Sequence, residues 1–179
     1  MSGGINAWNG LVAAGAHDAG LAYYSRASEP VELISLSWAL EEGNRVFYDR
    51  IFWSAPDLDA ASIFRSLSLA EEQHKKSLRE LHARVSGMDT DPPLPEGMTS
   101  GYWLEGGSPV EEALERVRGM KGNQILEYCM AMEANSLDRY IKMSRSVEGD
   151  RPRELFLRLS GEEKSHIARM ASLLDRWRG

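Results

Sequence analysis

Two Glu-x-x-His motifs, Glu71 to His74 and Glu163 to His166, lie 92 residues apart in a chain of 179 residues. The same offset pairs further residues without any gap: Phe64 with Phe156, Leu67 with Leu159, Leu78 with Met170, Leu81 with Leu173, Val85 with Trp177, Glu41 with Glu133 and Tyr48 with Tyr140. A repeat of this length, which keeps side-chain types at helical spacing, indicates a duplicated structural unit. We therefore predict two copies of one helical hairpin.

Long helical periods fill most of the chain and are separated by breaks rich in proline and glycine. We expect helices over about residues 30–53, 57–86, 108–147 and 151–178. Residues 87–108 contain three prolines and five glycines, too many for regular structure, and we expect them to form a long crossover. The fold class predicted from this pattern is all-α, a four-helix bundle made of two helical hairpins joined by the crossover.

Local signals mark several helix ends. Pro30 is suited to the first turn of a helix, and Asp57 is a good N-cap for the second helix. Gly87 can end that helix, and Gly119 with Gly122 predicts a break inside the third period.

The two motifs interrupt otherwise apolar stripes. Positions 64, 67, 71, 74, 78, 81 and 85 alternate steps of three and four, so they share one face of a helix that we expect to point inward. Positions 156–177 repeat this stripe on the last helix. The apolar neighbours of Glu41 and Glu133 at helical spacing place these two residues inward as well.

Four carboxylates and two imidazoles would then meet inside an apolar interior, where unpaired charges cost several kcal/mol and repel one another. Two divalent cations would balance four negative charges. The predicted metal ligands are Glu41, Glu71, His74, Glu133, Glu163 and His166. We expect Glu71 and Glu163 to bridge the ions, Glu41 and Glu133 to be terminal ligands, and each ion to take one histidine. Such ligands suit iron, manganese or zinc.

This arrangement resembles the ferritin-like di-iron or di-manganese pattern, a Glu from two helices and Glu-x-x-His from the other two. Over about residues 29–178 the chain resembles the rubrerythrin-like branch of that class. The likeness is carried by four segments: ALEEGNRVFY, LAEEQH, AMEANSLDRY and SGEEKSH. It implies the same six ligands, with Tyr48 as a hydrogen-bond donor to a ligand carboxylate. Tyr140 is a second candidate for such a role or for a redox role.

The resemblance implies a non-haem di-iron oxidoreductase that reacts with peroxide or dioxygen, takes electrons from an external donor and pairs into homodimers. Two departures leave alternatives open. Rubrerythrins carry a further ligand glutamate one turn after the helix 3 glutamate, where this chain has Ser136, and a rubredoxin-like iron centre, which the single cysteine, Cys129, cannot build. The alternatives are a metal-binding or storage module without turnover, and an assembly module with a structural ion such as zinc.

Composition limits the partners and the compartment. The net charge of −6 provides no basic surface for nucleic acid, and no apolar run is long enough to span a bilayer. A lone cysteine is typical of a reducing compartment, so we expect a cytoplasmic protein that binds neither nucleic acid nor membrane.

The first 28 residues differ from the rest. GGINAWNG resembles the C-terminal end of a rhodanese domain. We therefore divide the chain into residues 1–28, an N-terminal arm or the remnant of such a domain in a rhodanese fusion, and residues 29–179, the ferritin-like unit. The alternative is an ordinary arm rich in Gly and Ala.

The remaining polar residues near the motifs have simpler interpretations. Residues one position off the stripe are expected to face solvent or pair with a partner: Glu42, Glu72 and Glu162. His17 and His82 are predicted to lie on the surface, and Cys129 to be a small buried thiol.

Overall fold

The computed structural model describes residues 29–55 and 57–178. Within them it contains five helices: α2 (Pro30–Phe52), α3 (Leu58–Ser86), α4 (Val110–Val117), α5 (Gly122–Ser146) and α6 (Asp150–Arg178). The described part has no β-strand and only one isolated bridge, between Trp103 and Pro109. The predicted all-α class is confirmed. The predictions for residues 1–28, including His17 and the rhodanese-like end, lie outside the described residues.

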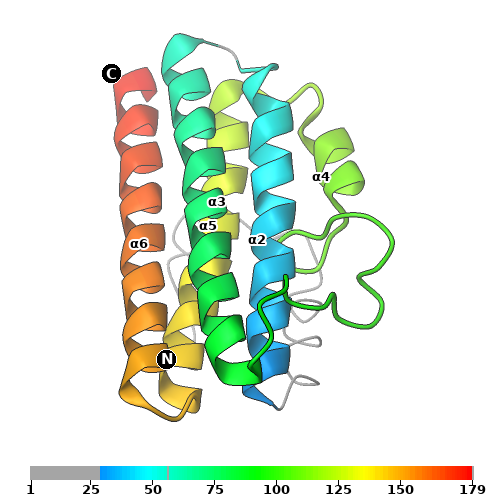
Figure 1. Cartoon of the computed structure of the whole chain (residues 1–179). Helices are drawn as coiled ribbons and strands as arrows, with labels where there is room; N and C mark the ends of the chain where they lie inside the picture. The colour runs from blue at the N-terminus through cyan, green and yellow to red at the C-terminus, as the bar shows by residue number, and fades with distance from the viewer. Residues whose placement is uncertain (1–28, 56, 179) are drawn as a thin grey trace, which may run out of the picture.

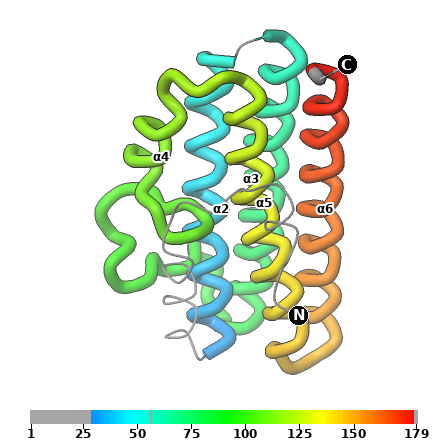
Figure 2. The backbone as a smooth tube through the Cα atoms, turned by 180° about the vertical axis from the view of Figure 1, so that it is seen from behind, coloured from blue at the N-terminus to red at the C-terminus, as the bar shows by residue number. Residues whose placement is uncertain are grey.

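Four long helices lie side by side, and the short helix α4 packs beside α2 (Figures 1 and 2). The first helix pair, α2 and α3, is joined by a short turn, and the second helix pair, α5 and α6, is joined in the same way. Contacts between α3 and α6 hold the two pairs together. Each pair therefore brings its own copy of the repeat to the interface between the pairs.

The helix ends follow the local signals. The Asp57 side chain accepts a hydrogen bond from the backbone nitrogen of Ala60 at 2.8 Å, which caps the first turn of α3. Gly87 ends α3 with a φ of 75°, a left-handed conformation that favours glycine. Gly119 also has a positive φ, and the predicted break separates α4 from α5. A short fifth helix results from that break.

The crossover between the pairs packs closely on α2. The backbone of Trp103 lies against Gly43, where an added Cβ atom would stand 1.9 Å from the carbonyl oxygen of Trp103. Any larger residue at position 43 would push the crossover away. The backbone nitrogen of Glu105 donates to the Asn44 side chain at 3.4 Å, next to this contact. The segment around Trp103 is therefore held against the middle of α2.

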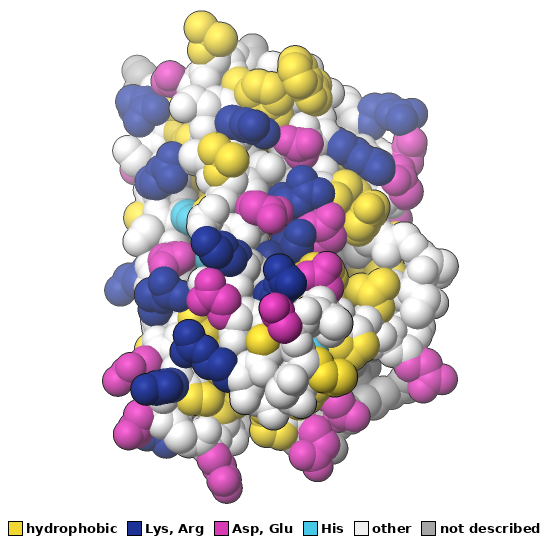
Figure 3. Space-filling view, viewed as in Figure 1, with side chains coloured by type: hydrophobic (Ala, Val, Ile, Leu, Met, Phe, Trp, Pro, Cys, Tyr) yellow, Lys and Arg dark blue, Asp and Glu magenta, His cyan; other side chains and the backbone are white. Residues whose placement is uncertain are grey.

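Among the described residues, two apolar clusters lie on either side of one polar level, and a third, smaller cluster lies between α2 and the crossover. On α3, Phe64 and Leu67 belong to one cluster, and Leu78 and Leu81 to the other. On α6 the order is reversed, because Phe156 and Leu159 belong to the second cluster and Met170 and Leu173 to the first. The two motifs stand between the clusters on both helices. Figure 3 shows, in contrast, that charged side chains of both signs are interspersed over the outer face.

Two predictions about single residues are wrong. His82, expected on the surface, is fully buried, and neither of its ring nitrogens has a hydrogen-bond partner among the described residues. Its position follows the buried Leu78 by one helical turn and so adjoins the inward stripe. Val85, expected at the end of the inward stripe, is 43% exposed, because the interior closes one turn earlier, at Leu81.

Candidate metal centre

The six predicted ligands lie together at the polar level of the interior. They come from all four long helices: Glu41 from α2, Glu71 and His74 from α3, Glu133 from α5, and Glu163 and His166 from α6. The four glutamates have no exposed surface, and the two histidines are buried as well. Helical spacing of three residues places each Glu and its His on one face, and each pair of helices completes the set with one further Glu.

The six residues form two overlapping groups of potential metal ligands. One group consists of Glu41, Glu71, His74 and Glu163, and the other consists of Glu71, Glu133, Glu163 and His166. Within each group one atom of every residue lies within 4.8 Å of the corresponding atoms of the others. Glu71 and Glu163 belong to both groups. The chain thus offers four ligand atoms at each of two neighbouring positions, with two carboxylates in common.

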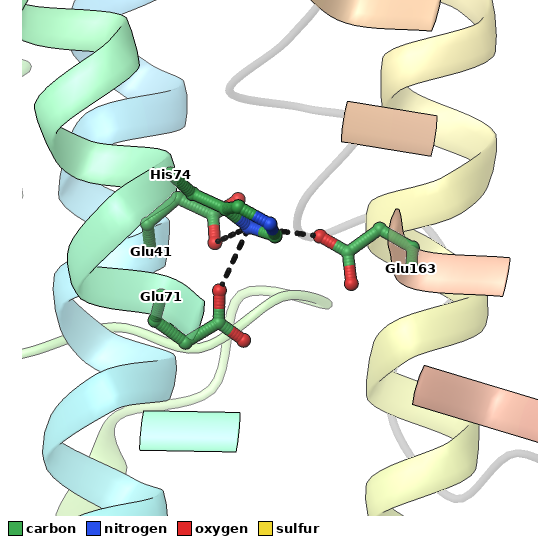
Figure 4. A group of neighbouring side chains, drawn as sticks. All are labelled: Glu41, Glu71, His74 and Glu163. Atoms are coloured by element: carbon green, nitrogen blue, oxygen red, sulfur yellow. Dashed lines mark hydrogen bonds and ion pairs between the residues drawn. The ribbon is translucent and has the colours of Figure 1, made fainter. Parts of the chain in front are cut away.

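The carboxylate of Glu163 lies between the two histidines. Its Oε1 atom is 3.3 Å from Nδ1 of His74, and its Oε2 atom is 3.2 Å from Nδ1 of His166. Figure 4 shows Glu163 on the opposite side of the His74 ring from Glu41 and Glu71. Each oxygen of this one carboxylate therefore faces a different half of the centre.

Nδ1 of each imidazole faces the cluster. In His74 this atom is 3.1 Å from Oε2 of Glu71 and 3.3 Å from Oε2 of Glu41, whereas Nε2 is 2.9 Å from Oε2 of Glu162. Because a carboxylate can only accept, the Nε2 hydrogen is donated to Glu162, and that hydrogen bond holds the pKa of Glu162 below its usual range. Although burial lowers it, contacts with the surrounding glutamates raise the pKa of His74 well above its usual range. When a cation displaces the proton on Nδ1, the lone pair of that atom would be directed into the cluster, as metal-binding histidines require.

Two tyrosines brace the cluster across the helix pairs. The hydroxyl of Tyr48, on α2, donates to Oε1 of Glu133, on α5. The hydroxyl of Tyr140, on α5, donates to Oε1 of Glu41, on α2. Each glutamate is thus oriented by the opposite pair and keeps its Oε2 atom for the cluster. Both hydroxyls therefore donate to glutamates of the candidate ligand set.

Several buried carboxylate oxygens accept no hydrogen bond. Among the described residues, neither oxygen of Glu71 and not the Oε1 atom of Glu163 accepts a hydrogen bond, although Nδ1 of His74 lies within 3.3 Å of an oxygen of each residue. An ionised carboxylate in an apolar interior is strongly unfavourable without such a partner. These oxygens belong to the two residues common to both groups, where a cation would be their natural partner. The donor set therefore fits a pair of metal ions.

The protonation of the cluster shows its excess negative charge. Burial raises the pKa of Glu71 well above its usual range, and the neighbouring charge of Glu41 raises it further. Burial and the carboxylate of Glu163 act in the same way on Glu133. Burial lowers the pKa of His166, but contacts with Glu133 and Glu163 outweigh it and raise the pKa to about 9. Without cations, the carboxylates and histidines reduce their mutual repulsion by binding protons. Bound cations would displace those protons.

Three further charged residues surround the ligands. Arg139 and Glu105, which were not predicted, form a buried ion pair beside Glu41, and Glu162, expected to face solvent or pair with a partner, pairs with His74. The repeat held a signal for two of them, since the 92-residue offset pairs Arg139 with Phe47 and Glu162 with Ala70. A charged residue at a position that is apolar in the other copy indicates a role specific to one half of the centre. Glu105 lies in the crossover and has no counterpart.

Two further predicted positions are buried beside the cluster. Cys129, one turn before Glu133, is fully buried in an apolar cluster, as expected for a small thiol. Ser136 is also fully buried, and its hydroxyl has no hydrogen-bond partner among the described residues.

Comparison with known proteins does not assign this centre to a family. No protein-family model matches the chain, and neither a curated protein nor a solved structure matches it. Within residues 29–55 and 57–178, none of the helices combines the length and the apolar character needed to cross a membrane.

Proposed function

We propose that this chain is a ferritin-like, rubrerythrin-like carboxylate protein that holds two iron ions and acts as an oxidoreductase on peroxide or dioxygen. The observation that carries the proposal is the pair of overlapping ligand groups, which have Glu71 and Glu163 in common. Two helix pairs joined by a crossover, with one Glu or one Glu-x-x-His on each long helix, support the ferritin-like assignment.

The residues fall into three roles around the two ions. Glu71 and Glu163 would bridge, because each belongs to both groups. Glu41 and His74 would complete one position, and Glu133 and His166 the other. Iron bound there would supply one-electron redox chemistry towards peroxide or dioxygen, and an external donor would return the electrons.

The chain's own contribution is to orient ligands and exclude water. Tyr48 and Tyr140 fix the terminal glutamates, and Glu162 keeps the hydrogen of His74 on Nε2. The apolar clusters on both sides of the polar level keep bulk water from the carboxylates. In such an interior a fixed charge acts more strongly than it would in water.

The proposal is tested by anaerobic loading with Fe(II) followed by a stoichiometric amount of peroxide. One peroxide and two protons should oxidise two Fe(II) to Fe(III) and yield two waters. The remaining Fe(II) is measured with a ferrous chelator after rapid quenching. Wild-type protein should oxidise its iron much faster than the Glu71→Gln/Glu163→Gln double variant, with Glu72→Gln as the matched control. Equal rates in wild type and the double variant would refute the catalytic role.

One observation favours a second candidate, a metal-binding or storage module without turnover. The position of the additional rubrerythrin ligand is occupied by Ser136, a buried residue that offers a hydroxyl and no charge. A module of this kind would take up two cations. Adding the loaded protein to a mixture of peroxide and reductant would then not increase the rate of peroxide consumption. The same loaded protein, with reductant in excess, distinguishes the two functions.

A further inference from the structure

Arg139 is a buried charged residue whose counterpart in the other copy of the repeat is apolar. Tyr48 and Tyr140 correspond, and so do Glu41 and Glu133, but the residue before each tyrosine is Phe47 in one copy and Arg139 in the other. Arg139 is only 7% exposed. A permanent positive charge is therefore buried at a level where the other half carries an aromatic ring.

Arg139 acts directly on one predicted ligand. Its Nη2 atom donates to Oε1 of Glu41 at 2.6 Å, and its guanidinium lies 4.2 Å from the centre of the Tyr140 ring. The same nitrogen forms an ion pair with Glu105 of the crossover. The backbone nitrogen of Glu105 in turn donates to the Asn44 side chain on α2. Arg139 is thus fixed between the cluster and the crossover.

This contact changes what Glu41 can offer to a cation. Its Oε1 atom already accepts from both Arg139 and Tyr140, and only Oε2 faces His74. Oε1 of Glu133, in contrast, accepts from Tyr48, a neutral donor. A cation bound beside Glu41 would share its carboxylate with a guanidinium, and two positive charges on one carboxylate repel each other in a dry interior.

A second asymmetric contact acts in the opposite direction and is weaker. Glu162 accepts from His74 and so increases the basicity of that imidazole, which favours metal binding. The Glu162 side chain is 41% exposed, so water screens its charge, whereas the Arg139 side chain is 7% exposed. Glu105 offsets part of the arginine charge but lies one hydrogen bond farther from the cluster. The net effect of the surroundings is to disfavour the position beside Glu41.

We propose that Arg139 is a positioning residue that makes the two cation positions unequal, so that the position of Glu133 and His166 fills first and the position of Glu41 and His74 fills second. This inference rests on the proposed two-ion centre. It adds an order of loading and a residue that sets it.

The test is a titration of the metal-free protein with Co²⁺, followed by calorimetry and by visible absorption. Wild type should bind in two steps whose dissociation constants differ by about tenfold or more. The charge-neutral double variant Arg139→Gln/Glu105→Gln should tighten the second step and bring the two constants within a few fold of each other. Arg139→Lys, which keeps the charge, is the matched control and should keep two separate steps.

Two further variants assign the steps and do not depend on the folding of the double variant. His166→Ala should abolish the tight step, and His74→Ala should abolish the weak step. The inference is overturned if wild type binds both ions in one step, if the folded double variant keeps the full difference, or if His74→Ala removes the tight step. A wild type that binds no Co²⁺ would instead mean that the two-ion centre itself is wrong.

Discussion

The two helix pairs present the same ligands to the interior and different side chains around them. The paired ligands and the two tyrosine braces agree in both halves. Among the described residues, only the first half has an arginine on its terminal glutamate and a carboxylate on Nε2 of its histidine. Both halves therefore require the ligands and the tyrosine hydrogen bonds, whereas the additional charges change the properties of one half only.

The outer faces differ as well. In the first helix pair Glu42 pairs with Arg45 at 2.8 Å and with Lys75 at 2.5 Å. The corresponding residues of the second pair are all apolar: Ala134, Leu137 and Ile167. The repeat is therefore retained in the interior and lost on the surface, as expected when only the interior has a common task.

The largest effect is expected at the residues that belong to both halves. Glu163→Gln should lower bound metal from about two ions per chain to less than one, because its two oxygens face both histidines. Metal content after loading and desalting is measured by elemental analysis. Glu72→Gln, an exposed change beside Glu71, is the control and should keep both ions. If Glu163→Gln retains two ions, the assignment of a common bridge is wrong.

Replacing either terminal glutamate should cost one bound ion, but the two variants should differ in the free energy of unfolding. Each of these glutamates contacts one histidine and one tyrosine. Glu41→Gln also removes one of the two charged partners of Arg139, and Glu133→Gln removes no such contact among the described residues. In the metal-free protein Glu41→Gln should therefore lower the free energy of unfolding by about 1–3 kcal/mol more than Glu133→Gln does. Urea unfolding in the presence of a chelator measures this difference, and equal losses would show that Arg139 does not depend on Glu41.

Glu105, which lies in the crossover and has no counterpart in the repeat, should add a pH dependence of its own to the stability of the protein. Burial raises its pKa from 4.5 to about 7, even though the charge of Arg139 opposes the shift. A raised carboxyl pKa means that the folded state holds the proton more tightly, so this contribution to stability is complete below pH 4.5 and is lost as the pH rises through 7. Relative to Glu105→Gln, wild type should lose up to about 3 kcal/mol of unfolding free energy over that interval. Parallel curves for the two proteins would contradict the shift.

The smallest effect is expected at the tyrosine braces. Tyr48→Phe removes the hydroxyl donor of Glu133 and should weaken cation binding by about tenfold. Tyr140→Phe should weaken it less, because Arg139 still holds the same oxygen of Glu41. Co²⁺ titration of both variants compares the braces directly. A larger loss in Tyr140→Phe would reverse the predicted order.

Much of the fold and the centre could be predicted because the signals are local or periodic. Asp57 and Gly87 mark helix ends through hydrogen bonding and φ preference, which depend on a few neighbouring residues. The inward stripe brings Glu71 and His74 into the interior because helical periodicity fixes which residues share a face. The pairing of copies then supplies the other half of the cluster.

The parts that were missed depend on the path of the crossover and on how the interior closes. Glu105 reaches the interior only because residues 98–109 fold back onto α2, and no periodicity records that path. Arg139 stands beside the stripe, where a charged residue usually faces solvent. The burial of His82 and the exposure of Val85 are set by the packing around the end of α3, which sequence alone does not give.

Anomalous X-ray diffraction from crystals grown with Mn²⁺ would locate both ions. We expect two anomalous peaks in each chain, one beside Glu41 and His74 and the other beside Glu133 and His166, with Glu163 between them. No peak in the interior, or a single peak bound by exposed carboxylates elsewhere, would contradict the two-ion centre.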